Sequence, residues 1–285
     1  MKHIFLLILI SAGLLAQTTK DEIKLIVRAD DIGFSHAVNN ACIKVFREGI
    51  ATSVEVIVPS PWFMEAVKLL KENPGYDVGV HLCLTSEWTN LKWRPMTNSP
   101  SLMNNDGYFF PFIWPNDLYP KNQNNFLLEN NPKPEEVEAE FRRQIEIAKK
   151  YIPNISHLDG HMGCTGANEQ IKAIAQKLSK EYGLPLDFPA EAKSLEWSAY
   201  NGIGAAKTEE DFISKLKELK PGIYYVIEHP GLDNDEMQAI YTKQGDEVAK
   251  SRQQVTNVWT SENVKKVIRD RKIKLISVKQ AFGTK

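Results

Sequence analysis

The sequence predicts an α/β protein built around a parallel barrel of about seven strands. Short apolar runs rich in β-branched residues alternate with amphipathic segments of helical length along most of the 285 residues. Alternating strands and helices are typical of parallel sheets with right-handed crossovers. The glycine signature of a dinucleotide-binding fold is missing. This number of strands therefore favours a closed barrel over an open doubly wound sheet.

The predicted strands are segments that are apolar throughout or that alternate between apolar and polar residues. In chain order they are residues 23–31, 51–58, 76–84, 155–161, 186–190, 222–229 and 273–277. The first ends on two adjacent carboxylates, Asp30 and Asp31, and Pro59 ends the second. Parallel strands would place all their carboxyl ends at one edge of the barrel.

The predicted helices are amphipathic or carry end signals. They are residues 36–48, 62–73, 134–151, 167–182, 208–219 and 260–271. Ser35 and Ser261 suit N-caps, Pro134 suits a first turn and Gly183 suits a C-terminal cap. No repeat or linker marks a second domain, so residues 21–285 are predicted to form a single domain.

Residues 1–16 are predicted to be a signal peptide. Lys2 and His3 precede an almost continuous apolar run over residues 4–16, which is short for a bilayer span but suits a secretory signal. Cleavage after Ala16 would give a secreted or periplasmic protein, and a retained membrane anchor is the alternative.

Composition excludes several classes of partner. The formal net charge of -1 gives no reason to expect nucleic acid or, once the signal is removed, a membrane as a partner. Cys42, Cys83 and Cys164 form no C-x-x-C motif and their odd count excludes a disulfide scaffold, although one disulfide stays open. The sequence also leaves open whether the protein forms a homodimer.

Polar residues fall at the ends of four predicted strands. They are Asp30, Asp31, His81, His161 and His229. Asp31, His81 and His161 would offer one carboxylate and two imidazoles to a divalent metal ion, with positions left open for water. Such a donor set accepts zinc readily, and magnesium is the alternative.

Asp30 and His229 suit catalytic roles beside such an ion. Asp30 could take a proton from a metal-activated water and His229 could give one to the leaving group, which would hydrolyse an amide or ester. Simpler interpretations also exist: Asp30 as a turn former, His81 as a hydrogen-bonded core residue and His229 as a turn anchor.

Residues 155–161 contain two further titratable residues, His157 and Asp159. His157, Asp159 and His161 share one strand face, and His157 and His161 would lie about 13 Å apart, too far to bind one ion. We therefore expect His157 to pack inside the barrel and Asp159 to orient His161 as an outer partner of the ligand.

Several stretches together carry a family resemblance. They are A-D-D-I-G-F-S-H-A-V-N-N-A and E-G-I-A-T-S between residues 29 and 53, G-V-H-L-C-L-T from Gly79, S-H-L-D-G-H from Ser156, E-H-P-G from Glu228 and R-Q-Q-V-T-N-V-W-T-S-E-N-V from Arg252. This set, which covers nearly the whole chain after the signal, resembles the YdjC-like carbohydrate deacetylases, the group of chitooligosaccharide deacetylase. That group belongs to the glycoside hydrolase/deacetylase barrel superfamily.

The resemblance implies a distorted barrel that removes N-acetyl groups from small amino-sugar oligosaccharides. It assigns the metal to Asp31, His81 and His161, the base to Asp30 and a catalytic or polarising role to His229. Met162-Gly163-Cys164 stands where many family members have further histidines, which leaves metal identity and substrate open. Predicted secretion favours a periplasmic or extracellular glycan.

The long loop over residues 85–133 is rich in aromatic residues, and a loop of that length is usually functional. Because sugars stack on aromatic rings, Trp88, Trp93 and Arg94 are candidates for substrate contact. The alternative is that these aromatic residues form a satellite core.

Two other functions are compatible with the pattern. A metal-independent glycosidase would need a second carboxylate about 5–9 Å from Asp30. Glu228 is close in sequence to the site, but strand alternation predicts that its side chain faces the other way. A glycan-binding protein with a relict site is the third interpretation, against which the intact Asp30 argues.

Overall fold

The computed structural model describes residues 22–116, 125–197, 208–242 and 247–283, so the predicted signal peptide lies outside the described residues. These residues form one seven-stranded sheet in the order β4-β3-β2-β1-β6-β5, with β7 pairing with β1, and every strand pair is parallel. The strands are β1 Ile23–Ile32, β2 Ser53–Val56, β3 Asp77–Leu82, β4 Ile155–Gly160, β5 Lys193–Ser194, β6 Gly222–Glu228 and β7 Lys274–Leu275.

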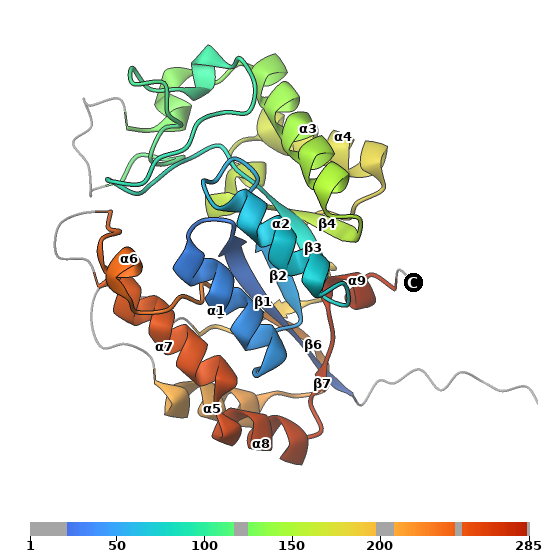
Figure 1. Ribbon diagram of the computed structural model, residues 1–285. Helices are drawn as coiled ribbons and strands as arrows, with labels where there is room; N and C mark the ends of the chain where they lie inside the picture. Colours follow the sequence, from blue (N-terminus) through green and yellow to red (C-terminus); the bar gives the residue numbers. More distant parts are fainter. Residues whose placement is uncertain (1–21, 117–124, 198–207, 243–246, 284–285) are drawn as a thin grey trace, which may run out of the picture.

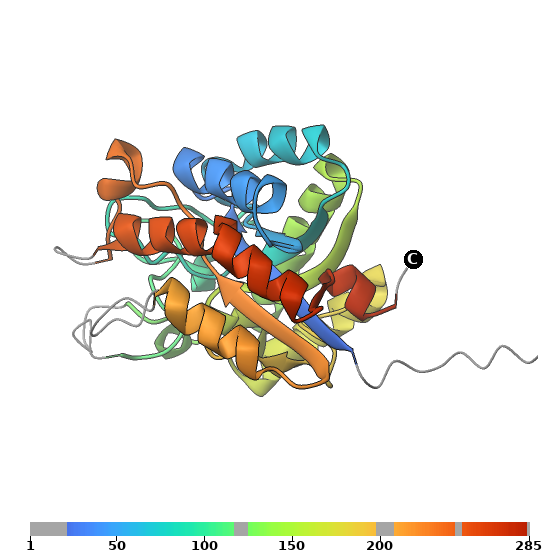
Figure 2. The ribbon, with the colours of Figure 1, turned by 90° about the horizontal axis from the view of Figure 1, so that it is seen from below.

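Helices surround the curled sheet on its outer side (Figure 1, Figure 2). The α-helices are α1 His36–Arg47, α2 Phe63–Glu72, α3 Pro134–Tyr151, α4 Glu169–Tyr182, α5 Glu209–Glu218, α6 Asp235–Gln238, α7 Val248–Thr260, α8 Glu262–Asp270 and α9 Val278–Ala281. Three 3₁₀ segments are η1 Pro100–Leu102, η2 Leu127–Asn130 and η3 His161–Gly166. Ser35, Ser261 and Gly183 cap α1, α8 and α4 as predicted.

The gap between the two edge strands is bridged by the segment after α4. Leu158 donates to Pro185 O (2.8 Å) and accepts from Asp187 N (2.9 Å), which ties this segment to β4. Further along, Leu195 N donates to Tyr225 O (2.7 Å) on β6. The predicted α/β fold with a distorted parallel barrel is confirmed.

Two predicted details differ from the structure. Residues 186–190 are not a strand, because Asp187 adopts a positive φ of 62° and Pro189 has no N–H to donate, so Leu186 makes only an isolated bridge. The fifth strand lies at Lys193–Ser194 instead. Helix α7 has no counterpart among the predicted elements, and the helix predicted from residue 260 begins at Glu262, after its Ser261 cap.

Strand alternation gives the sheet one apolar face and one polar face. Val27, Val54 and Val80 belong to the main hydrophobic core, which lies between the sheet and the helices. The opposite face carries Arg28 on β1, Glu55 on β2 and His157 on β4, all buried. A polar network therefore occupies part of the inner side of the barrel, next to a small apolar cluster that includes Ile26 on the same strand face as Arg28.

Gly79 on β3 makes room for this network. His157 Nε2 lies 2.5 Å from Glu55 Oε1, and Gly79 is in register with both residues on the neighbouring strands. A Cβ on Gly79 would overlap Glu55 Oε2 and come within 2.5 Å of His157 Nε2. A side chain at this position would therefore separate a buried ion pair.

Many aromatic residues of the 85–133 region are structural. Phe109, Phe110 and Leu102 are fully buried and belong to the same core as the strands.

In the part of the chain that the structure describes, no helix is both long and apolar enough to cross a membrane.

We predict that Gly79→Ala lowers the free energy of unfolding by roughly 1–3 kcal/mol or more, because overpacking forces apart a buried charged pair. Urea denaturation followed by circular dichroism measures this loss. Gly75→Ala is the matched control, since no atom lies within 4 Å of its added Cβ. Equal stability of the two variants would contradict the role assigned to Gly79.

Candidate active site

A β-bulge at the end of β1 brings two adjacent carboxylates to one side of the strand. Ala29 pairs with Val54 and Ile32 with Val56, so β1 contains one residue more than β2 between these pairs. Regular alternation would send Asp30 and Asp31 to opposite faces. Asp31 instead has a φ of 77°, and the bulge turns its side chain toward the inner side of the barrel.

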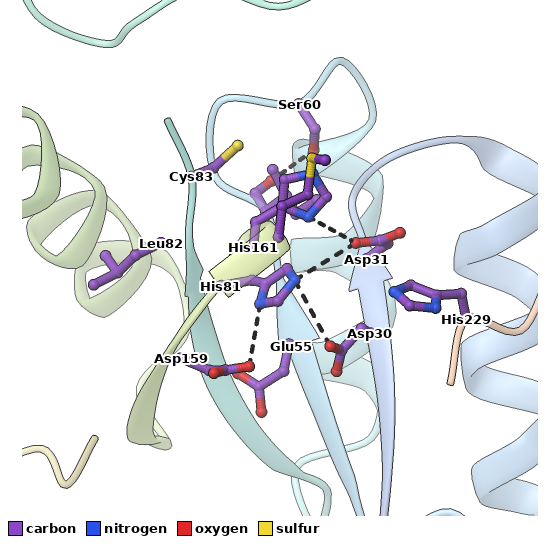
Figure 3. A network of polar contacts seen from close by, with 12 residues as sticks. Asp30, Asp31, Glu55, Ser60, His81, Leu82, Cys83, Asp159, His161 and His229 are labelled. Atoms are coloured by element: carbon purple, nitrogen blue, oxygen red, sulfur yellow. Dashed lines mark hydrogen bonds and ion pairs between the residues drawn. The ribbon is translucent and has the colours of Figure 1, made fainter. Parts of the chain in front are cut away.

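His81 lies between the aspartates and a third carboxylate (Figure 3). Its Nε2 is 3.7 Å from Asp30 Oδ2 and 3.6 Å from Asp31 Oδ1. Its Nδ1 faces Asp159 Oδ2 at 3.6 Å. Burial, partly opposed by Asp159, lowers the pKa of His81 to about 4, so its imidazole is neutral at neutral pH. A neutral imidazole is the form that binds metal ions.

Asp31, His81 and His161 converge as predicted. One potential ligand atom from each lies within 4.8 Å of the others, and all three side chains are buried. Asp31 Oδ1 and His161 Nδ1, which are 3.4 Å apart, have no hydrogen-bond partner among the described residues. Buried polar atoms without partners are rare, and one carboxylate with two imidazoles fits a divalent cation.

A second cluster, Asp30, His81 and Asp159, is also close enough to hold an ion. Arg28 already balances its charge: Nε donates to Asp30 Oδ1 (2.8 Å), Nη2 donates to Asp30 Oδ2 (3.0 Å), and Nη2 also pairs with Asp159. A guanidinium between the two carboxylates makes this cluster the poorer cation site.

Neither Arg28 nor Arg252 was among the predicted site residues. Arg28 lies two residues before Asp30 on the same strand face, which is a local signal that could have found it. Arg252 comes from α7, and its Nη2 donates to Asp31 Oδ2 at 2.7 Å. Burial raises the pKa of Asp31, but Arg252 and His229 outweigh it and hold that pKa well below its ordinary value.

Asp159 was predicted to orient His161, but in the structure it faces His81 instead. Asp159 is in register with His81 across the β3–β4 ladder, so these two residues are neighbours on one face. His161 lies beyond the end of β4, at the start of η3, and its Nε2 contacts Glu87 Oε2 at 3.1 Å. His157 is fully buried beside Glu55, so it packs inside the barrel as predicted.

A cavity of about 300 Å³ opens beside the cluster. Its lining residues are Asp31, Glu87, Trp88, Phe112, His161, Met162, Glu228, His229, Thr242, Val248, Ser251, Arg252 and Val255. His229 is 42% exposed in this wall, and its Nδ1 lies 3.9 Å from Glu228 Oε2. Glu228 is in register with Ala29, yet it lines this cavity together with Asp31 and His229, so the prediction that its side chain faces away from the site is not confirmed.

The three predicted sugar-contact residues have different surroundings. Trp88 lines the cavity. Trp93 is buried, donates from Nε1 to Cys83 Sγ (3.4 Å) and packs 6.4 Å from the ring of His161. Arg94 is exposed, contacts Gly107 O (3.1 Å) and the Tyr108 ring, and is not part of the cavity wall.

A larger hollow of about 580 Å³ lies at the opposite end of the barrel, around Asp77, Asn154 and Lys279. It contains none of the clustered histidines.

The three cysteines are buried and free, so the alternative of one disulfide is excluded.

Several known proteins that are similar to this chain are named as carbohydrate deacetylases. A carbohydrate deacetylase of Brevibacillus brevis is 29% identical over 269 residues, which cover 89% of this chain and 98% of that protein. Carbohydrate deacetylase 2 of Listeria innocua is 34% identical over 163 residues, 57% of this chain and 59% of that protein.

A solved structure from Enterococcus faecalis, proposed to be a cellobiose-phosphate cleavage protein, aligns with a TM-score of 0.73 and 25% identity. The alignment covers 91% of this chain and 98% of that one. The family model described as YdjC-like protein matches residues 24–270. The chain is therefore a member of the YdjC-like protein family.

Proposed function

We propose that the protein is a metal-dependent carbohydrate deacetylase that removes N-acetyl groups from amino-sugar oligosaccharides. The observation that carries this proposal is the buried cluster of Asp31, His81 and His161, whose facing atoms Asp31 Oδ1 and His161 Nδ1 lack hydrogen-bond partners within the described ranges. The names of the Brevibacillus and Listeria relatives support the reaction.

Asp31, His81 and His161 would hold the ion, either zinc or magnesium. A divalent cation at this position would polarise the acyl carbonyl and lower the pKa of a water molecule. The acyl group would enter the cavity beside the cluster, whose wall includes Trp88 and Phe112.

Asp30 would act as general base toward the attacking water. Arg28 donates to both of its oxygens, which fixes the orientation of the carboxylate. Burial raises the pKa of Asp30 to about 6, against the opposing effect of Arg28. At neutral pH Asp30 is therefore mostly ionised and more basic than an ordinary aspartate, as a general base requires.

His229 would act as general acid toward the leaving amine. Its partial burial lowers the pKa of His229, but Asp31 and Glu228 outweigh this effect and raise that pKa above its ordinary value, which favours the protonated form. The amide C–N bond breaks, the water oxygen joins the acyl carbon as acetate, and the His229 proton passes to the amine.

The oligosaccharide would enter through the cavity and contact Trp88. The predicted signal peptide supports a periplasmic or extracellular glycan as the natural substrate. The name of the Brevibacillus relative supports a carbohydrate as the class of substrate.

The proposed function predicts acetate release from N-acetylated chito-oligosaccharides by the mature protein. A chelator should abolish the release and zinc or magnesium should restore it. Acetate release that a chelator does not affect would refute metal dependence. Release of reducing ends without acetate would point to a glycosidase.

We predict that His81→Ala and His161→Ala each weaken metal binding by more than ~100-fold, since even residues one shell further out change affinity by 10–100-fold. Metal content after dialysis, measured by atomic emission, checks this. His36→Ala is the control, because His36 is exposed on α1 and pairs with Glu65 away from the cluster. Undiminished metal in either cluster variant would exclude that residue as a ligand.

We predict that Asp30→Asn retains the metal but lowers kcat by about 10²–10⁴-fold, the usual contribution of a general base. The amide keeps the size of the side chain and removes its ability to accept the proton. Steady-state kinetics and metal content of the same sample test the two parts together. Wild-type turnover in this variant would remove Asp30 from the mechanism.

A further inference from the structure

Arg252 is held rigidly where α7 approaches the cluster. Its side chain is 8% exposed, and its guanidinium carbon lies 5.1 Å from the centre of the Phe34 ring and 5.4 Å from that of Trp88. Two aromatic faces and the ionic contact with Asp31 leave the guanidinium little freedom to turn.

The backbone around Arg252 is fixed as well. Gly231 N donates to Arg252 O (3.1 Å), and Thr256 Oγ1 donates to Gly231 O (2.8 Å). A Cβ on Gly231 would come within 2.8 Å of Arg252 Cβ, so only glycine permits this close approach. These contacts hold helix α7 against Gly231, two residues after His229.

Because of this placement, the two oxygens of Asp31 have different surroundings. Oδ2 accepts from Arg252, whereas Oδ1 faces His161 Nδ1 at 3.4 Å and His81 Nε2 at 3.6 Å and accepts no hydrogen bond within the described part of the chain. Asp30 differs, because Arg28 binds both of its oxygens. Arg252 therefore leaves a single oxygen of Asp31 available on the side of the histidines.

We propose that Arg252 is a positioning residue that restricts Asp31 to binding the divalent cation through one oxygen. The inference rests on the proposed metal site. With Arg252 in place, Asp31 occupies one coordination position and the remaining positions stay open for water and substrate. Without it, Oδ2 is free to bind the cation too, which fills one of those positions.

Charge repulsion alone predicts a different effect of removing Arg252 on metal affinity. The Arg252 charge repels a cation, so removing it should not weaken metal binding. A change in metal affinity thus cannot test the coordination mode, whereas a spectrum that reports coordination number can. Cobalt(II) is a suitable probe because its visible absorption weakens as the number of ligands rises.

The experiment compares the cobalt-loaded full-length mature protein with Arg252→Gln and Arg252→Lys. We expect Arg252→Gln to bind one cobalt, to show a weaker and shifted visible spectrum, and to lose about 10–100-fold in kcat with a smaller change in KM. Arg252→Lys, which keeps the charge and one donor, should recover part of both signals.

Arg142→Gln is the matched control, because Arg142 pairs with Glu138 and Glu181 on the outer surface. It should give the wild-type spectrum. An unchanged cobalt spectrum in Arg252→Gln overturns the inference whatever happens to kcat, and so does a folded Arg252→Gln that binds no cobalt. Wild-type protein that binds no cobalt would refute the metal site itself, and this inference with it.

Discussion

The structure depends on balancing the charges of two adjacent, buried carboxylates. Asp30 and Asp31 are 3% and 1% exposed, and like charges in such surroundings are unstable unless cations or donors compensate them. Arg28 compensates Asp30 from the same strand, and Arg252 compensates Asp31 from a helix 221 residues later. Because the second partner is so distant in sequence, the site exists only when the C-terminal helices have packed against β1.

The charges on the polar inner face of the barrel also depend on one another. Arg28 pairs with Asp159 and lies 4.0 Å from Glu55, which in turn contacts His157. Breaking one member of such a network leaves a neighbouring charge buried without a partner, which costs more than the pair itself contributes. The residues that orient the site are therefore also residues on which the fold depends.

Much of the site could be predicted because parallel strands place their carboxyl ends at one edge, which brings Asp31, His81 and His161 together. The position of Asp31, by contrast, depends on a β-bulge that no local sequence pattern marks. Helix α7 was not predicted, although five of its seven buried residues are apolar; Arg252 and Thr256 interrupt that apolar stripe. Arg252, which contacts the site, thus weakens the apolar pattern of the helix that carries it.

The two aspartates differ because only one obeys the geometry of the strand. Asp30 keeps the alternation of β1, so it shares a face with Arg28 and uses both oxygens on it. Asp31 adopts a left-handed conformation, which costs about 1–2 kcal/mol. It also keeps one buried oxygen without a hydrogen bond in the described residues, and an unsatisfied buried group costs about 1–3 kcal/mol. Both unfavourable terms fall on the same residue, and a ligand that binds Oδ1 would remove the second of them. Strain and an unsatisfied atom at one position favour Asp31 as the cation ligand, whereas both oxygens of Asp30 accept from Arg28.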